Sequence, residues 1–222
     1  MNKLFALHFL FALLLPLGAF GQSPDPATKP VPPFLAAIPD NSACTIAVTF
    51  LDMPAKPSPG HRAIDQLILT KSGATRELVS VYTDGSRSEI WFSQGYRLER
   101  IPPRQEVLVT PIPKGTSDSE NTDFPHLEWL ALANYVDIES QGGKTCWHFK
   151  TEVKLKEQGL IVNYSAYIDV KTKLPVVWEF ATAHYELTSI APATLSDMPP
   201  DFAKALKAYR AAAAVPNAYR KS

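Results

Sequence analysis

The clearest pattern in this chain is a strict alternation of apolar and polar residues. In KTCWHFKTEVKL (144–155), every second residue from Trp147 to Leu155 falls on one face, and the polar residues from His148 to Lys154 fall on the other. LIVNYSAYIDV (160–170) repeats the pattern. A period of two residues is typical of a β-strand with one packed face and one polar face. Both segments are therefore predicted to be antiparallel strands.

Shorter runs rich in Val, Ile, Thr, Tyr and Trp, separated by turn residues, predict further strands. These runs are residues 44–51, 63–71, 75–83, 86–93, 96–101 and 106–112. Another long strand is predicted at 175–190, with a bulge near Ala181 to Tyr185, where the period is lost. Because most connections are short, sequential strands should pair as hairpins in a meander of about eight or nine strands.

Two helices are predicted. Asp123 can cap a helix over residues 124–136, with Leu127 and Leu130 on its apolar face. A second helix within residues 196–214 starts near Pro199 and Pro200, and an apolar stripe runs along it. The fold class is therefore α+β, mostly antiparallel β, with one covering helix and one C-terminal helix.

The opening of the chain has the pattern of an export signal. Lys3 precedes an apolar run at residues 4–15, and the small residues Ala19 and Gly21 lie where a signal peptidase reads the chain. The run is about a dozen residues, short of the ~20 needed to cross a bilayer as a helix, and no later stretch is longer. We expect a mature chain from Gln22, periplasmic or secreted, without a transmembrane segment.

Proline marks the next boundary. Residues 22–40 contain six prolines and predict an extended linker, because proline lacks the amide hydrogen that helices and sheets use. We therefore expect a signal peptide at 1–21, a linker at 22–40, a β domain at 41–195 that includes the helix at 124–136, a helix at 196–214 and a flexible tail at 215–222.

Charge and cysteine content limit the function. The 22 basic residues balance the 22 acidic ones, so nucleic acid is not expected as a partner. Cys44 and Cys146 are the two cysteines, and in an oxidising compartment such a pair favours a structural disulfide over two free thiols.

Two stretches resemble the periplasmic lipoprotein-sorting carriers, the lipoprotein localisation factor-like superfamily. AYIDVKTKLPVVWEF (166–180) resembles a hairpin of that family, and TRELVSVYTDGSRSEIWFSQGYRLERIP (75–102) is similar to its early meander. The resemblance covers most of residues 44–190. It implies an incomplete barrel, or half-barrel, that curls around a helical lid and shelters a lipid chain. The chain departs from the family in its proline-rich N-terminal segment and its alanine-rich C-terminal helix.

The aromatic residues of the best-patterned strands are the candidate site. They favour a non-catalytic function, the binding of a lipid, an acyl chain or another apolar ligand in the half-barrel. The candidate ligand-binding residues are Trp147, Phe149, Tyr164, Trp178 and Phe180, with Leu127 and Leu130 from the covering helix. The alternative is that these residues form a closed core in a structural or protein-interaction module of the cell envelope, with an envelope protein as partner.

Catalytic signatures are missing from the sequence. It contains no Gly-x-Ser-x-Gly, His-Glu-x-x-His, phosphate-binding glycine loop or Cys-x-x-Cys motif. No cofactor and no metal site are predicted, because His148 and His184, on outward faces, could share an ion only if distant strands brought them together.

Overall fold

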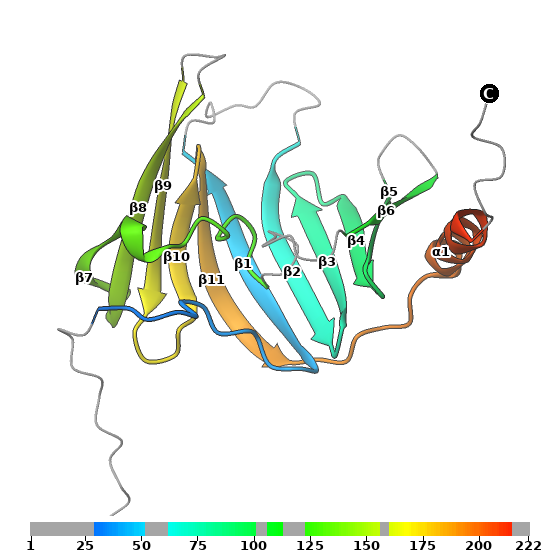
Figure 1. The fold of residues 1–222 in the computed structure, drawn as a ribbon, viewed down its shortest axis with the longest axis horizontal. Coiled ribbons are helices and arrows are strands. Elements are labelled where there is room, and N and C mark those ends of the chain that lie inside the picture. Colours follow the sequence, from blue (N-terminus) through cyan, green and yellow to red (C-terminus); the bar gives the residue numbers. More distant parts are fainter. Residues whose placement is uncertain (1–28, 52–61, 101–105, 113–122, 156–159, 215–222) are drawn as a thin grey trace, which may run out of the picture.

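The computed structural model describes residues 29–51, 62–100, 106–112, 123–155 and 160–214. These residues form one sheet of eleven strands, with neighbouring strands antiparallel (Figure 1). The strands are β1 (Ser42–Phe50), β2 (Ile64–Ser72), β3 (Thr75–Tyr82), β4 (Arg87–Ser93), β5 (Tyr96–Arg100), β6 (Val107–Pro111), β7 (Tyr135–Gln141), β8 (Lys144–Leu155), β9 (Leu160–Asp169), β10 (Pro175–Phe180) and β11 (Ala183–Pro192).

β1 lies at the centre of the sheet. The order β6-β5-β4-β3-β2-β1-β11-β10-β9-β8-β7 shows that the chain runs outward from β1 to β6 and returns from β7 to β11. β1 pairs with both β2 and β11. The end strands β6 and β7 do not pair with each other in the described sheet, so it stays open and curved, consistent with the predicted half-barrel (Figure 1).

The sequence pattern located most strands but missed two features. The predicted strand 175–190 is in fact two strands, β10 and β11, and the predicted bulge is the turn between them. Ala181 has a φ of 56° there, a conformation that glycine or asparagine usually signals and alanine does not. β7 was also missed, because its first residues fall in the predicted helix.

The predicted helix over residues 124–136 was wrong. The segment contains turns and a short 3-10 helix, η1 (Leu132–Asn134), after which β7 begins. His126 has a φ of 62°, which interrupts a right-handed helix. Asp123, which was predicted to cap the helix, instead accepts a hydrogen bond from the backbone N–H of Ile38. Leu127 and Leu130, whose spacing predicted a helix, therefore lie in a turn-rich segment. We call this segment, residues 123–131, the crossing loop.

The inner face of the sheet carries the main core. It is defined by the buried side chains of Ile46 and Val48 on β1, Trp178 on β10 and their neighbours. Two irregular segments cover this face, the crossing loop and residues 29–41, which we call the N-terminal segment (Figure 1). The described part of the predicted linker is thus packed, and the amide of Ala36 donates to the carbonyl of Lys173 at 2.9 Å.

The C-terminal helix α1 (Pro200–Ala213) packs on the opposite, outer face of the sheet, near its β6 end (Figure 1). Leu78 on β3 packs against the main core and pairs with Ile90 on β4, so Ile90 also faces inward. Successive residues of a strand face opposite sides, and Trp91 therefore faces outward. Trp91 and Leu98 form a separate core with Phe202 and Leu206 of α1. The predicted helix is therefore present, five residues shorter than the span 196–214.

Candidate ligand-binding site

The predicted aromatic residues lie together on the inner face. Six of the seven belong to the main core cluster, and Tyr164 meets Phe180 edge to face, with 5.0 Å between ring centroids. Trp178 and Phe149 are fully buried, and Trp147 and Leu127 nearly so. Tyr164, Phe180 and Leu130 are half-buried. Tyr185 was not among the predicted residues, and its ring stacks on Trp178 with 5.3 Å between ring centroids.

These side chains contact segments of the same chain. From the N-terminal segment, Phe34 meets Phe149 at 5.3 Å. From the crossing loop, Phe124 meets Trp178 at 6.3 Å, and the indole N–H of Trp178 donates to the carbonyl of Pro125 at 3.0 Å. In this structure the central inner face is therefore filled by the protein itself. The role of the seven residues in ligand binding stays a prediction.

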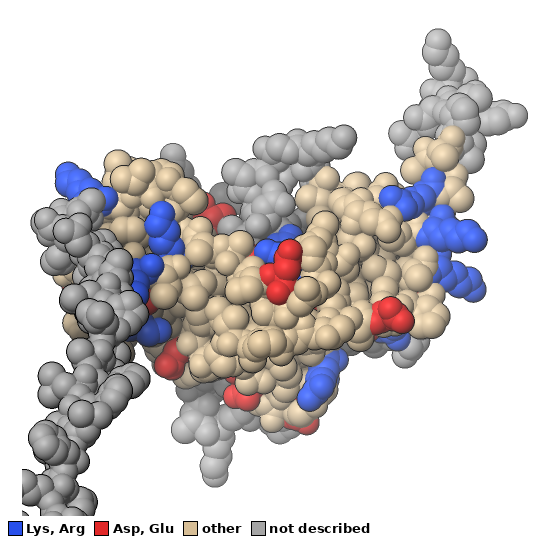
Figure 2. Space-filling model, turned by 90° about the horizontal axis from the view of Figure 1, so that it is seen from below, with Lys and Arg blue, Asp and Glu red and all other residues tan. Residues whose placement is uncertain are grey.

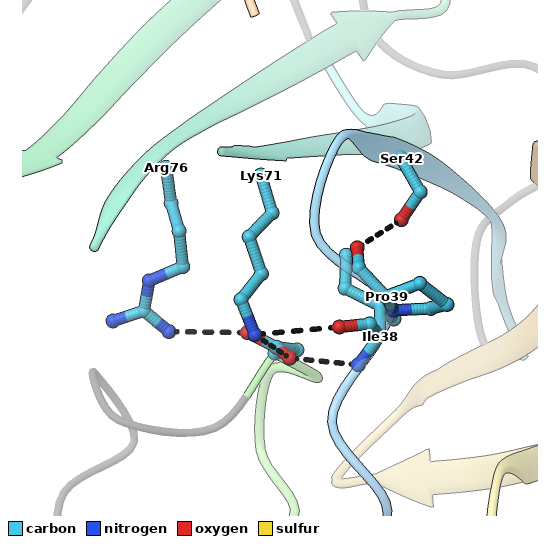
Figure 3. Close-up of polar contacts among 6 residues, drawn as sticks. Ile38, Pro39, Ser42, Lys71 and Arg76 are labelled. Carbon is cyan, nitrogen blue, oxygen red and sulfur yellow. Dashed lines mark hydrogen bonds and ion pairs between the residues drawn. The ribbon is translucent and has the colours of Figure 1, made fainter. Parts of the chain in front are cut away.

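A buried carboxylate joins the two covering segments to the sheet. The side chain of Asp123 is 4% exposed, and its Oδ2 accepts from the N–H of Ile38 at 2.9 Å and from Nζ of Lys71 at 3.0 Å (Figure 3). Arg76 lies opposite Lys71 in the β2–β3 pairing and approaches Oδ1 at 3.5 Å. We call Asp123, Lys71 and Arg76 the Asp123 cluster. No local pattern indicates it, because Asp123 is 47 and 52 residues away from its two partners.

The predicted disulfide is not formed, and both cysteines are free. Cys44 lies in the inner core, whereas Cys146 packs outward against Val176 and Val177. β11, β10 and β9 separate their strands. Adjacent strands lie ~4.8 Å apart, and a disulfide needs Cα atoms within about 7 Å. Burial raises the pKa of Cys44 to about 12, so its thiol is protonated and unreactive.

A hollow lies on the outer face, between β4 and α1. It has a volume of about 580 Å³ and includes the turn before β3 and the segment leading into α1. We call it the groove. Trp91, Met198 and Leu206 give it an apolar wall, while Lys207 and Arg210 supply positive charge. Asp197 is the carboxylate of its lining. The seven predicted residues do not line it.

Contacts of two kinds hold α1 in place beside the groove. Phe202 and Leu206 are buried against the outer face. Arg100 pairs with Asp201 at the start of the helix and lies over the ring of Phe202. Near the other end, Arg210 lies over the ring of Tyr96 at 5.4 Å. Basic side chains lie at this end of the molecule and also at the opposite end of the same view, with acidic side chains between and beside them (Figure 2).

A second hollow of about 420 Å³ lies on the outer face of β3, β4 and β5. Glu77 and Glu89 line it together with Arg87 and Arg100. Burial, and then repulsion by Glu89, raise the pKa of Glu77 above its ordinary value. Its polar lining makes it a poor match for an apolar ligand.

His148 and His184 do not meet. His148 lies on β8 and His184 on β11, with two strands between them. The Nδ1 atom of His184 is 3.3 Å from Glu179. The Nδ1 atom of His148 instead faces two carboxylates, those of Asp137 and Glu139 on β7. The sequence did not predict this arrangement, because β7 itself was missed.

No protein-family model matches this chain, and no curated protein sequence is similar to it. Several solved structures are similar to it, and three of these align with most of it. An uncharacterised conserved protein of Thermus thermophilus has a TM-score of 0.43 at 8% identity, over 72% of this chain and 86% of that one. Lipoprotein LppX of Mycobacterium tuberculosis has a TM-score of 0.37 at 10% identity, over 70% and 88%. LprF of Mycobacterium bovis has a TM-score of 0.37 at 9% identity, over 71% and 89%.

At TM-scores below 0.5, these likenesses support no conclusion about this chain, and the family that its sequence resembles stays a prediction. In the part of the chain that the structure describes, no helix combines the length and apolar character needed to cross a bilayer.

Proposed function

We propose that this protein is a non-catalytic binding protein for an amphiphile, a molecule with an acyl-like apolar part and an anionic head group. The groove between β4 and α1 is the proposed site. The observation that carries the proposal is the lining of this groove, in which an apolar wall lies beside Lys207 and Arg210. Its volume of about 580 Å³ lies within the ~300–1,000 Å³ typical of small-molecule pockets.

The groove offers a ligand two kinds of interaction. An acyl chain against Trp91, Met198 and Leu206 would lose contact with water, which is favourable in proportion to the apolar area covered. A carboxylate or phosphate would pair with Lys207 and Arg210. The indole N–H of Trp91 is buried without an acceptor among the described residues, so a ligand oxygen that reached it would satisfy a donor.

The groove accommodates a ligand without rearrangement, whereas the inner face does not. A ligand at Trp178 or Phe149 would have to displace the N-terminal segment and the crossing loop. That displacement would break the hydrogen bond between Ile38 and Asp123 and expose buried aromatic area. We therefore assign the outer groove rather than the half-barrel interior.

A second candidate function is the protein-interaction module. The closed packing of the inner face favours it, because a filled half-barrel has no interior space for cargo. In either case, the export signal proposed for residues 1–21 would place the protein in the periplasm or outside the cell.

The test is native mass spectrometry of the purified protein with palmitate and with phosphatidylglycerol. We expect a bound mass that is lost on denaturation. Lys207→Ala combined with Arg210→Ala should weaken binding about tenfold, a change of about 1.4 kcal/mol. Lys204→Ala is the matched control, since Lys204 lies on α1 outside the groove lining and should bind like the wild type.

Two results would redirect the proposal. Binding that survives both groove substitutions but changes in Phe34→Ala, which uncovers Phe149, would place the ligand on the inner face. Failure of the wild type to bind either lipid would favour the interaction module.

A further inference from the structure

Three metal-ligating side chains converge on the outer face at the β7 edge of the sheet. Asp137 and Glu139 alternate along β7, so both point to one face. His148 lies on β8 directly opposite Asp137. One donor atom from each side chain lies within 4.8 Å of the other two. We propose that Asp137, Glu139 and His148 bind a divalent transition-metal ion, and that Zn²⁺ is the ion they match best.

Two of the three distances between the ligand atoms match a shared ion, and one of them, from His148 Nδ1 to Asp137 Oδ1, is also a long hydrogen bond. Nδ1 of His148 lies 3.3 Å from Oδ1 of Asp137 and 3.3 Å from Oε1 of Glu139. Charge-assisted hydrogen bonds between nitrogen and carboxylate are shorter, about 2.7–2.9 Å. Tetrahedral zinc with bonds of ~2.0–2.2 Å separates neighbouring ligand atoms by about 3.4 Å. The two distances from Nδ1 match this separation, and the two carboxylate oxygens, which lie within 4.8 Å of each other, would close on the ion by rotation of their half-exposed side chains.

Neighbouring residues orient the imidazole for this role. Nε2 of His148 lies 3.4 Å from the hydroxyl oxygen of Ser165, and the ring stacks on Tyr167 at 4.6 Å with 7° between the planes. If Nε2–H donates to Ser165, Nδ1 presents its lone pair to the carboxylates. Metal-binding histidines usually have such a partner on the second ring nitrogen. The side chain of His148 is 11% exposed, so its position is well constrained.

Charge and access also favour a cation. Asp137 and Glu139 together carry two negative charges, and His148 is the one ion-pair partner of either within the described residues. Lys144 and Lys150 lie on the same face of β8 and form no ion pair with them there. The carboxyl side chains are 52% and 45% exposed, so an ion can enter from solvent and water can complete its coordination. A bound ion would tie the edge strand β7 to β8.

The chain contains a matched comparison on the same sheet. His184 lies 3.3 Å from Glu179, but one carboxylate and one imidazole make an incomplete ligand set. This pair should therefore bind the ion much more weakly. The proposed metal site is also separate from the groove. The two share no residue, and the metal site lies on β7 and β8 whereas the groove lies beside β4, toward the other end of the sheet.

The test is calorimetric titration of the purified, chelator-treated protein with ZnCl₂. We expect one site in the wild type. The double variant Asp137→Asn/Glu139→Gln should bind at least ~10-fold more weakly. The control His184→Gln should bind like the wild type. Because the substituted side chains of both variants are partly exposed, both variants should fold, which near-ultraviolet circular dichroism checks.

A second readout is the melting temperature. Excess Zn²⁺ should raise the melting temperature of the wild type and of His184→Gln but not that of the double variant, because an ion that binds the folded state stabilises it. The proposal is overturned if the wild type binds no zinc, if the double variant binds as tightly as the wild type, or if His184→Gln loses binding to the same extent.

Discussion

Asp123 joins the two segments that cover the inner face to the sheet. Its carboxylate pairs with Lys71 and Arg76, whose side chains are 16% and 14% exposed, and it also accepts a hydrogen bond from the N–H of Ile38. Asp123→Asn keeps the size of the side chain but removes the negative charge that these two part-buried cations approach. We expect the free energy of unfolding to fall by about 3 kcal/mol, as when one partner of a buried pair is removed. Urea unfolding measures it.

The control for Asp123 is another aspartate in an exposed pair. Asp201→Asn removes the ion pair with Arg100, in which the two side chains are 46% and 36% exposed. It should change the free energy of unfolding by less than about 1 kcal/mol. Equal losses in the two variants would mean that Asp123 does not hold the covering segments.

The cysteines carry a second prediction at this scale. Cys44 and Cys146 are buried, and burial raises the pKa of both thiols. Iodoacetamide should therefore modify neither in the folded protein and both in denaturant, because the thiolate is the reactive form. Mass spectrometry after each treatment measures the result. Recovery of a peptide that links the two cysteines from an unreduced digest would contradict the structure.

Glu77 gives a prediction for pH. Its pKa is raised in the folded protein, so the charged form is the less favourable one there. Its ionisation lowers stability at pH 7, and the penalty disappears as the pH falls through the folded pKa toward the ordinary value of 4.5. Glu77→Gln should therefore be more stable than the wild type at pH 7, with a gain that vanishes near pH 4. Urea unfolding of both proteins at pH 7 and at pH 4 measures the gain, and an equal gain at the two pH values would contradict the prediction.

Among the larger elements, the N-terminal segment makes the most direct test of packing. Ile38 is 2% exposed and belongs to the inner core, whereas Val31 in the same segment is 65% exposed. Ile38→Ala should lower the free energy of unfolding by about 2–4 kcal/mol, because it removes buried methyl groups and leaves a cavity. Val31→Ala should change it by less than ~0.5 kcal/mol. Comparable small effects for both variants would show that the segment is a loose linker.

The elements that sequence pattern predicted are those whose signal is local. Alternation in residues 144–155 located β8, and the two prolines before Asp201 with a buried stripe located α1. The prediction for the segment after Asp123 was wrong because the spacing of Leu127 and Leu130 fits a helix as well as a loop that packs on the core. Two features favour the loop over the helix, the positive φ of His126 and the hydrogen bond between Asp123 and the distant Ile38. A local sequence pattern contains neither.

For the whole molecule, the sequence predicted an open antiparallel sheet. It did not predict which surfaces of the sheet carry the groove and the proposed metal site. Strand order separates Cys44 from Cys146 by three intervening strands and brings Asp137 and Glu139 beside His148. The groove likewise requires residues near 72 and 91 to meet α1. These contacts depend on long-range pairing, which periodicity alone does not specify. The aromatic residues were found together because they lie on neighbouring strands.

The inner core is separate from the core beneath α1 on the outer face, and this division predicts how the molecule opens. The inner core includes Phe149 and Trp178, while α1 joins Trp91 and Leu98 on the outer face. Leu206→Ala should weaken the docking of α1, since Leu206 is 6% exposed, without disturbing the inner core. Hydrogen exchange should then accelerate at residues 200–213 and stay unchanged in β8 and β9.

The reciprocal variant is Phe149→Ala. It removes a fully buried ring from the inner core and should lower the free energy of unfolding by about 3–5 kcal/mol, with faster exchange throughout the sheet. Faster exchange in β8 and β9 after Leu206→Ala would show instead that the cores unfold as one unit. If the cores are separate, an amphiphile in the groove should slow exchange in α1 and leave β8 and β9 unaffected, since binding to the folded state suppresses local opening.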